Sequence, residues 1–158
     1  MSEPSEQRSD KRYVPRDKYR VDFYYNLETK VEFVSADEKE SKVGKHTGLS
    51  KNFSVRGMCF MSDVQLHRGD HLSLQVYIPL QDKPICMEGE VCWSDKRQAE
   101  GGQAAYNTGV MLNSVEGKSV EETIYHDERY DVDWSEVLES VLGRYRILAQ
   151  EQNKREQE

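Results

Sequence analysis

Apolar and polar positions alternate along the first two thirds of the chain, and this alternation predicts short β-strands. From Tyr19 onward, Val21, Phe23 and Tyr25 alternate with more polar residues, which is typical of a strand with one buried face. Residues 31–34 extend or repeat this strand, and the same pattern, with glycine and aspartate at the turns, predicts further strands at 50–54, 57–61, 71–78, 85–94 and 106–112. About six short strands within fewer than 100 residues indicate an all-β core, either a small antiparallel barrel or a sandwich.

Two parts of this pattern leave alternatives open. Residues 35–48, rich in Asp, Glu, Lys, Ser and Gly, are consistent with a hairpin loop or with an irregular excursion between strands. In the strand at 85–94, alternation groups Trp93 with Met87 and Val91, opposite Cys86, Glu88, Glu90 and Cys92. An aromatic residue at that position suits the core or the wall of a ligand pocket.

The last forty residues follow a helical pattern instead. Ser119 with Glu122 forms a capping box that predicts a helix through about Glu128, and Asp133 with Glu136 repeats the device. In the second predicted helix, one apolar stripe runs at helical spacing through Trp134, Val137, Leu138, Val141, Leu142, Tyr145 and Leu148. We expect this stripe to pack on the barrel. The alternative is self-association or partner binding through residues 134–148.

Charge is distributed unevenly along the 158 residues. The net charge of −7 divides into +2 for residues 1–20, −3 for residues 21–115 and −6 for residues 116–158. An acidic chain lacks the basic face that binds nucleic-acid phosphates, which argues against a polymeric nucleic-acid partner. The basic N-terminus leaves room for a small anionic ligand.

The ends of the chain and its apolar content bear on compartment. Residues 1–11 are too polar to bury a core, and we expect a flexible tail there. No apolar run reaches the length of a membrane span, and the first residues lack the apolar stretch of a secretory signal. The chain is therefore expected to be soluble and cytoplasmic.

Catalytic and metal-binding motifs have little support. The cysteines are odd in number and have no CxxC spacing, so buried free thiols are expected at Cys59, Cys86 and Cys92. The four histidines show no metal-binding spacing and adjoin no recognisable nucleophile, and the glycines form no dinucleotide or triphosphate loop. We expect neither an enzyme nor a metal or cofactor.

Two short motifs do stand out in combination. Arg12-Tyr-Val-Pro-Arg16 precedes Asn52-Phe-Ser54-Val-Arg-Gly57, and together they resemble the PilZ domain signature, RxxxR followed by (D/N)xSxxG. Later segments, Gly89-Glu-Val-Cys-Trp93 and Tyr106-Asn-Thr-Gly109-Val110, are similar to consecutive strands of that family. The resemblance covers residues 11–115. It implies a six-stranded β-barrel followed here by C-terminal helices, and it implies binding of cyclic di-GMP, a bacterial second messenger.

The residue types suit such a ligand. Arginine presents a planar fork of donors that pairs with phosphate or with the O6/N7 edge of guanine, and its flat face stacks on a base. Pro15 restrains the backbone between Arg12 and Arg16, so both could close over one ligand as a clasp. Asn52 and Ser54, two apart, are expected on one strand face, with Gly57 providing conformational freedom or close approach at a bend.

Lys11, Trp93 and Gly109 are secondary candidates. Family members that bind an intercalated ligand pair commonly have arginine just before the first arginine of the motif, whereas this chain has Lys11, which leaves the stoichiometry open. Trp93 could stack on guanine, and Gly109 lies in one of the family-like strands. Arg8, Arg20 and Arg56 would add positive potential nearby.

The expected organisation is a tail at 1–11, a barrel domain with its arginine clasp at 12–115 and a helical extension at 116–158. The expected function is a cyclic di-GMP receptor that orders its clasp and signals to an unidentified protein effector. One alternative is an adaptor of the same fold that does not bind the nucleotide. A second is a single-strand-binding barrel with stacking residues Phe23, Tyr24 and Tyr25, which the net charge opposes.

Overall fold

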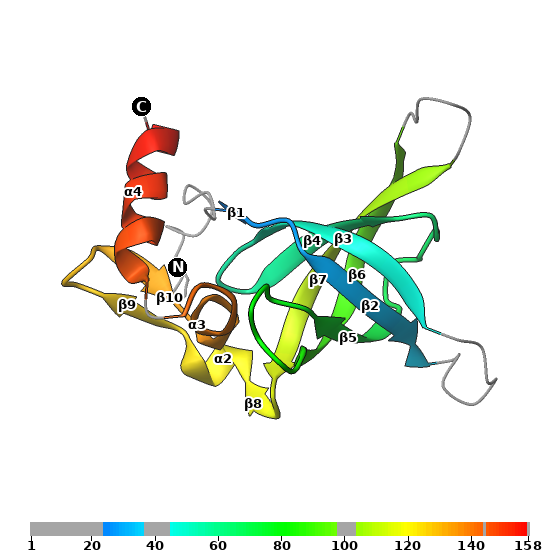
Figure 1. Cartoon of the computed structure of the whole chain (residues 1–158), viewed down its shortest axis with the longest axis horizontal. Coiled ribbons are helices and arrows are strands. Elements are labelled where there is room, and N and C mark those ends of the chain that lie inside the picture. Colours follow the sequence, from blue (N-terminus) through cyan, green and yellow to red (C-terminus); the bar gives the residue numbers. More distant parts are fainter. Residues whose placement is uncertain (1–23, 37–44, 98–103, 144, 158) are drawn as a thin grey trace, which may run out of the picture.

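The computed structural model describes residues 24–36, 45–97, 104–143 and 145–157. Figure 1 shows a β-barrel with a group of short helices and a hairpin at one end. The strands are β1 (Tyr25–Asn26), β2 (Lys30–Ser35), β3 (His46–Phe53), β4 (Gly57–Ser62), β5 (His71–Val76), β6 (Ile85–Arg97), β7 (Ala105–Val115), β8 (Lys118–Ser119), β9 (Tyr125–Asp127) and β10 (Val132–Trp134). The helices are α2 (Val120–Thr123), α3 (Glu136–Leu142) and α4 (Arg146–Gln157).

Six strands close the barrel, as the sequence predicts. Their order is β3-β2-β5-β6-β7-β4, and β4 pairs back with β3, every pairing being antiparallel. Each strand predicted from 31 to 112 overlaps one of β2 to β7, but the predictions at 50–54 and 71–78 run past Phe53 and Val76, where β3 and β5 end. Of the strand predicted from Tyr19, only the end at Tyr25 lies in the described residues, where β1 pairs with β3.

The described barrel strands contain three register shifts. The one between Glu88 and Gly89 leaves Asn113 of β7 without a partner on β6, and the other two change where side chains of β3 and β6 point. In β3 the register shifts between Ser50 and Asn52, and in β6 it shifts between Val91 and Trp93. A bulge inserts one unpaired residue, so the two residues that follow the last buried position can both face outward. Because of the bulge in β6, Trp93 lies on the outer surface with 43% of its area exposed, although Val91 is buried.

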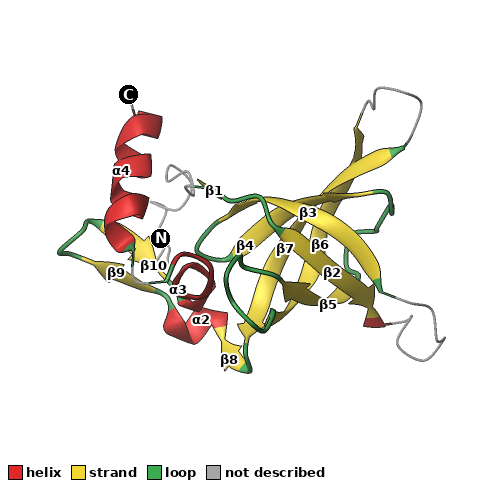
Figure 2. Ribbon diagram, viewed as in Figure 1, coloured by secondary structure: helices red, strands yellow, loops and turns green. Residues whose placement is uncertain are grey.

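The barrel interior is filled by large apolar side chains. Phe33 and Phe60 pack in a tilted arrangement with ring centroids 4.8 Å apart, and Phe53, Leu74 and Met87 are equally buried. Removing such side chains from water supplies most of the stabilisation of a small domain. Figure 2 shows how the strands surround this interior.

One polar group is built into the wall of the barrel. Ser50 is fully buried, and its hydroxyl donates to the carbonyl of Leu27 at 2.6 Å and accepts from the amide of Thr29 at 2.9 Å. A buried hydroxyl is tolerated when it is hydrogen-bonded in this way. The contacts fix the segment between β1 and β2 against β3.

The first predicted C-terminal helix is much shorter than expected. Helix α2 covers only Val120–Thr123, and the Ser119 side chain makes no capping hydrogen bond. Residues beyond it form the β9–β10 hairpin, in which Tyr125 pairs with Trp134. The prediction of helix through about Glu128 is therefore wrong, because cross-strand pairing with β10 satisfies the backbone that the helix would have used.

The second predicted helix is divided in two and begins later. Asp133 and Trp134 belong to β10, and Ser135 caps α3 by accepting from the amide of Val137 at 3.2 Å. Gly143, with φ of 65°, ends α3. This left-handed conformation favours glycine and turns the chain before α4 begins.

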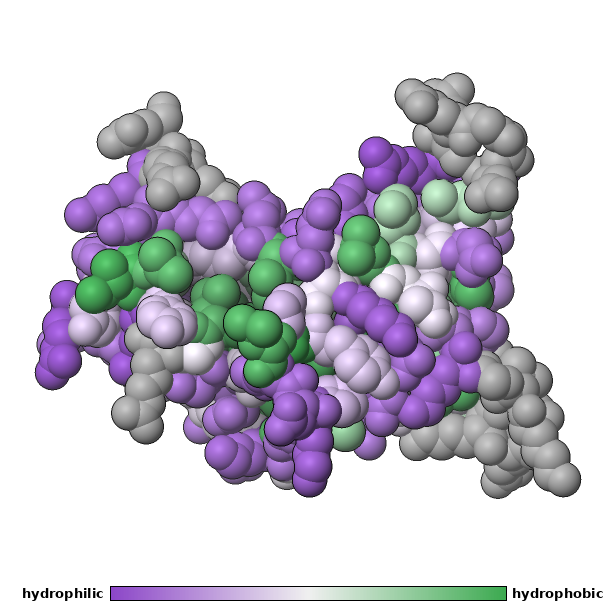
Figure 3. Space-filling view, in the orientation of Figure 1, coloured by the Kyte–Doolittle hydropathy of each residue, from purple (hydrophilic) through white to green (hydrophobic). Residues whose placement is uncertain are grey.

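The predicted apolar stripe divides at this break. Val137, Leu138 and Val141 are buried in the same core cluster as the barrel residues, which confirms the expected packing. Tyr145 and Leu148, beyond Gly143, are exposed instead. Figure 3 shows apolar side chains gathered on the visible face around α3 and the start of α4.

Arg146 joins α4 to the hairpin. Its guanidinium lies 5.2 Å from the ring centroid of Trp134 and 5.5 Å from that of Tyr125. It also pairs with Asp127 at 3.0 Å and with Glu139 at 3.3 Å. Cation–π and charge-assisted contacts of a partly buried arginine hold these elements together.

No helix in the described part of the chain is long and apolar enough to cross a membrane.

Candidate functional site

Four residues form one row across the outer face of the barrel. Asn52 on β3 pairs with Cys59 on β4, Cys59 pairs with Gly109 on β7, and Gly109 pairs with Trp93 on β6. Directly opposed residues on antiparallel strands project from the same face and are close neighbours. The second sequence motif and the family-like strands therefore meet on one surface.

A depression of about 570 Å³ lies over this row. Its lining comes from β3, the β3–β4 turn, β4, β6 and β7, with Tyr24 from the start of the described chain. The lining residues are Tyr24, Lys51, Asn52, Ser54, Arg56, Gly57, Met58, Cys59, Cys92, Trp93, Asn107, Gly109, Val110 and Met111. A concave site with aromatic, amide and cationic groups together is typical of a small-molecule site.

Aromatic and apolar surfaces are exposed in the depression. Trp93 and Tyr24 are 43% and 47% exposed, and the Met111 side chain is exposed as well. Exposed large apolar residues are ordinary when scattered, but here they gather in one concave place. Flat rings of this kind offer a stacking surface to a planar base.

Gly109 makes room for Trp93. A Cβ placed on Gly109 would come within 2.3 Å of Nε1 and Cε2 of the Trp93 indole. No real Cβ atom tolerates that distance, so only glycine lets the ring lie against β7. The bulge turns Trp93 outward, and Gly109 then lets the ring lie against β7.

Two amide oxygens at the site have no hydrogen-bond partner in the part of the chain that the structure describes. Oδ1 of Asn52 and Oδ1 of Asn107 are both buried and unpaired. An unsatisfied buried acceptor costs roughly 1–3 kcal/mol. Such groups persist where they serve a purpose other than stability, and both line the same depression.

Cationic groups border the site on one side. Lys51, the extra residue of the β3 bulge, has no ion-pair partner among the described residues. Arg56 is bound to the Glu121 carboxylate of α2. Lys51 is thus available to an anion without the loss of an existing ion pair.

The turn from Ser54 to Gly57 differs from what the motif spacing suggests. Ser54 lies beyond the end of β3, where its hydroxyl accepts from the amide of Gly57 at 3.1 Å and its own amide donates to the carbonyl of Gly57 at 2.8 Å. Asn52 and Ser54 therefore do not share one face of a regular strand. Ser54 closes the turn. At Gly57 a Cβ would lie 2.3 Å from the Val110 carbonyl oxygen, so close approach requires the glycine there.

The cysteines are free but not all buried. Cys59 is half-buried, and its burial raises the pKa of the thiol. Cys86 and Cys92 are exposed, so the prediction of three buried thiols is wrong for these two. Both occupy outward positions of β6, and Cys92 is the extra residue of the bulge.

The family follows from a comparison over most of the chain. Residues 6–125 match the sequence model of the PilZ domain. The chain belongs to the PilZ domain family. Among solved structures, the chain is similar to the PilZ domain with cyclic di-GMP of YcgR from Escherichia coli, with a TM-score of 0.50 and 12% identity. The match covers 87% of this chain and 95% of that one, and at this identity it shows the fold alone. No curated protein sequence matches the chain.

The structure brings some of the predicted PilZ site residues together. Asn52, Ser54, Gly57, Trp93 and Gly109 all line the depression. Arg12, Arg16 and Lys11 lie outside the described residues.

Sequence reasoning did not assign Lys51 or Asn107 to the site, and it considered Tyr24 only as a stacking residue for single-stranded nucleic acid. Alternation gave no signal for Lys51, because the bulge that turns it outward leaves no trace in the pattern. Asparagine inside a strand, where it is depleted, was a usable signal for Asn107.

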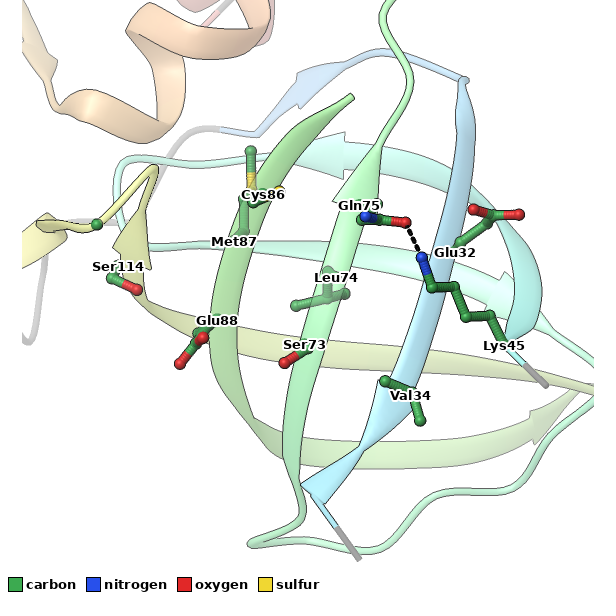
Figure 4. Close-up of a pocket in the computed structure, with 11 residues that line it drawn as sticks. Glu32, Val34, Lys45, Ser73, Leu74, Gln75, Cys86, Met87, Glu88 and Ser114 are labelled. Carbon is green, nitrogen blue, oxygen red and sulfur yellow. Dashed lines mark hydrogen bonds between the residues drawn. The ribbon is translucent and has the colours of Figure 1, made fainter. Parts of the chain in front are cut away.

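A second depression, of about 540 Å³, lies on another part of the barrel (Figure 4). There Lys45 donates to Gln75 at 2.5 Å, and Glu32 accepts from the Tyr77 hydroxyl at 2.5 Å. This bond lowers the pKa of Glu32 and raises the pKa of Tyr77. Because these polar groups bond to one another, the depression beside Asn52 and Trp93 is the stronger candidate.

No group of His, Cys, Asp and Glu side chains within the described ranges is arranged to hold a metal ion.

Proposed function

We propose that this protein is a receptor for cyclic di-GMP and that the ligand occupies the depression beside Asn52 and Trp93. The observation that supports this most directly is the pair of bulges, which turn an amide and an indole onto one concave surface. Membership of the PilZ family and the cyclic di-GMP named for the similar YcgR domain agree with the proposal.

Each part of the ligand has a complementary group in the depression. A guanine base stacks on Trp93, with Tyr24 as a second aromatic surface, and the Asn52 amide bonds to its edge. The ammonium of Lys51, which has no ion-pair partner among the described residues, faces a phosphate. Ser54 and Gly57 act by holding the turn in shape beside the ligand.

The arginine clasp completes the site in this proposal. Arg16 is eight residues before Tyr24, which itself lines the depression, so a chain that extends up to about 3.3–3.6 Å per residue reaches any part of it. Arg12 is four residues further away. Both guanidinium groups pair with guanine or phosphate when the N-terminal segment folds over the ligand.

Closing the clasp also provides a route for the signal. The backbone carbonyl of Tyr24 accepts from Nε2 of Gln152 on α4 at 3.1 Å. A ligand that draws the N-terminal segment onto the barrel therefore also pulls on Tyr24, which already contacts α4. A cytoplasmic effector protein then recognises the new surface.

The alternative is an adaptor that does not bind the nucleotide. Its supporting observation is the exposed apolar side chains at the start of α4, where Ile147 and Leu148 are 53% and 54% exposed. Such an adaptor would use these residues for protein contact in every state. The adaptor hypothesis predicts that cyclic di-GMP does not bind and does not change these protein contacts.

Calorimetric titration of the full chain with cyclic di-GMP tests the proposal and also gives the stoichiometry. We expect saturable binding that Trp93→Ala and Asn52→Ala each weaken by about tenfold or more. Lys83→Ala is the control, since Lys83 is an exposed lysine that does not line the depression. Absence of binding by the folded wild-type chain would exclude the receptor and favour the adaptor.

A further inference from the structure

Asn107 occupies an unusual position in the barrel wall. It lies on β7, two residues before Gly109, and pairs with Met61 on β4 and with Asp95 on β6. It lines the depression, yet its buried Oδ1 has no hydrogen-bond partner. It lies inside the family-like segment from Tyr106 to Val110, but it is not one of the site residues predicted from the sequence.

Stability gives no reason for asparagine at this position. Asparagine is depleted in strands, and an unsatisfied acceptor adds a desolvation cost that an apolar or β-branched residue would avoid. The next residue on β7 shows how a buried polar side chain is otherwise accommodated. Thr108 is buried, and its hydroxyl forms a hydrogen bond with that of Ser94 at 3.0 Å. The unpaired amide therefore points to a contact made by a bound molecule.

The register places Asn107 beside the base-stacking residue. Trp93 pairs with Gly109, so Asn107 is its diagonal neighbour on β7, a separation of about 7–8 Å that large side chains bridge. Asn52 lies two strands away, on the far side of Cys59. Two strand spacings of about 4.8 Å and one two-residue step of about 6.8 Å separate the two asparagines by roughly 12 Å at their backbones. Two amide side chains that reach toward each other across that gap leave room for one edge of a base between their oxygens.

We propose that Asn107 is a specificity-determining residue that, with Asn52, accepts hydrogen bonds from the Watson–Crick edge of a guanine seated against Trp93. This inference rests on the proposed function. Guanine carries two adjacent donors on that edge, N1–H and the N2 amino group, which match two unpaired acceptor oxygens. Adenine has a single donor group there, its N6 amino group, beside the acceptor N1. Binding of adenine would leave one oxygen unpaired and set the other against N1.

The test compares cyclic di-GMP with cyclic di-AMP, which has the same sugar-phosphate ring and differs only in its bases. The affinities of both ligands are measured for the wild-type chain, Asn107→Ala and Asn107→Asp. Asn113→Ala is the matched control, since Asn113 is an exposed asparagine on the same strand outside the depression.

The expected results concern selectivity more than affinity. We expect the wild-type chain to prefer cyclic di-GMP and Asn107→Ala to reduce that preference about tenfold. Asn107→Asp keeps an acceptor and should keep the preference, while Asn113→Ala should change neither affinity. In thermal melting without ligand, Asn107→Ala should be at least as stable as the wild type, because it removes an unsatisfied buried group.

Three outcomes would overturn the inference, and they differ in meaning. A wild-type chain that binds neither dinucleotide would refute the proposed function together with this inference. A wild-type chain that binds cyclic di-GMP, with Asn107→Ala unchanged in its affinity for either dinucleotide, would refute the inference alone. Equal weakening of both ligands would also refute it, since that result assigns Asn107 to the shape of the pocket.

Discussion

The indole of Trp93 lies over Gly109 on the neighbouring strand, and neither residue would hold its role without the other. The bulge at Cys92 turns Trp93 outward, and the missing side chain of Gly109 lets its ring lie against the barrel. Together they place an aromatic surface in the depression that Asn52 also lines. The site therefore depends on a backbone irregularity and on one glycine as much as on the motif residues.

Gly109→Ala should displace the indole. The new Cβ would collide with ring atoms 2.3 Å away. Because Trp93 is half-exposed, its ring can move into solvent and the core stays intact. We expect cyclic di-GMP affinity to fall about tenfold or more, by loss of stacking, with a small change in melting temperature. Titration and tryptophan fluorescence measure both effects. Unchanged affinity with altered fluorescence would show that Trp93 does not stack on the ligand.

Arg12→Ala and Arg16→Ala test the clasp. An arginine–guanine pair is worth roughly 1–3 kcal/mol, so the double variant should lose about 2–6 kcal/mol, or roughly thirty-fold to several ten-thousand-fold in affinity. Arg68→Ala is the control and should change affinity little, since Arg68 is an exposed arginine outside both motifs and outside the depression. A double variant that binds like the wild type would remove the clasp from the proposal.

Hydrogen exchange of residues 1–18 tests whether the ligand orders the clasp. Their composition cannot bury enough apolar surface to order the segment alone. We expect amide protection there to rise when cyclic di-GMP is added. Equal protection with and without ligand would indicate a preformed lid or a segment that takes no part.

Leu138→Asp and Leu148→Asp separate the two roles of the C-terminal helices. Leu138 is fully buried against the barrel, so an unpaired carboxylate there should destabilise the fold by roughly 3 kcal/mol or more. Leu148 is 54% exposed and should leave the melting temperature nearly unchanged. Sedimentation of the same variants tests association: a smaller species for Leu148→Asp than for the wild type would assign self-association to α4. A well-folded Leu138→Asp protein would contradict the packing of α3.

His126 should make stability depend on pH. Its hydrogen bond with Asp133 and its contact with Asp131 raise the pKa of His126 above the ordinary value of 6.5, against a smaller effect of burial. A group whose pKa is raised by folding stabilises the protein fully below its unfolded pKa, and this contribution is lost as pH rises through the folded pKa. Thermal melting from acidic to alkaline pH should therefore show a decline that begins near pH 6.5 and is weaker in His126→Gln. Identical slopes for both proteins would show that the histidine is not coupled to folding.

The sequence by itself determined the strands and the broad architecture. Alternation with period two located the segments that became β2 to β7, because a half-buried strand must place apolar side chains on one face. The Asn52-x-Ser54-x-x-Gly57 motif also identified the turn at the edge of the site. These features are local, so local pattern was sufficient to find them.

Only the tertiary structure decided which face each site residue occupies. The bulges at Lys51 and Cys92 shift the alternation by one residue, and whether a strand bulges depends on its pairing partners rather than on its own sequence. The helix ends were set in the same way. Residues that the capping boxes predicted to be helical form the β9–β10 hairpin instead. Gly143 divides the apolar stripe, so that Leu138 is buried and Leu148 is exposed. At these positions, pairing with distant strands outweighs local helix propensity. Residues differ in helix preference by only a few tenths of a kcal/mol, and a backbone hydrogen bond or a buried contact with a distant strand contributes more than that.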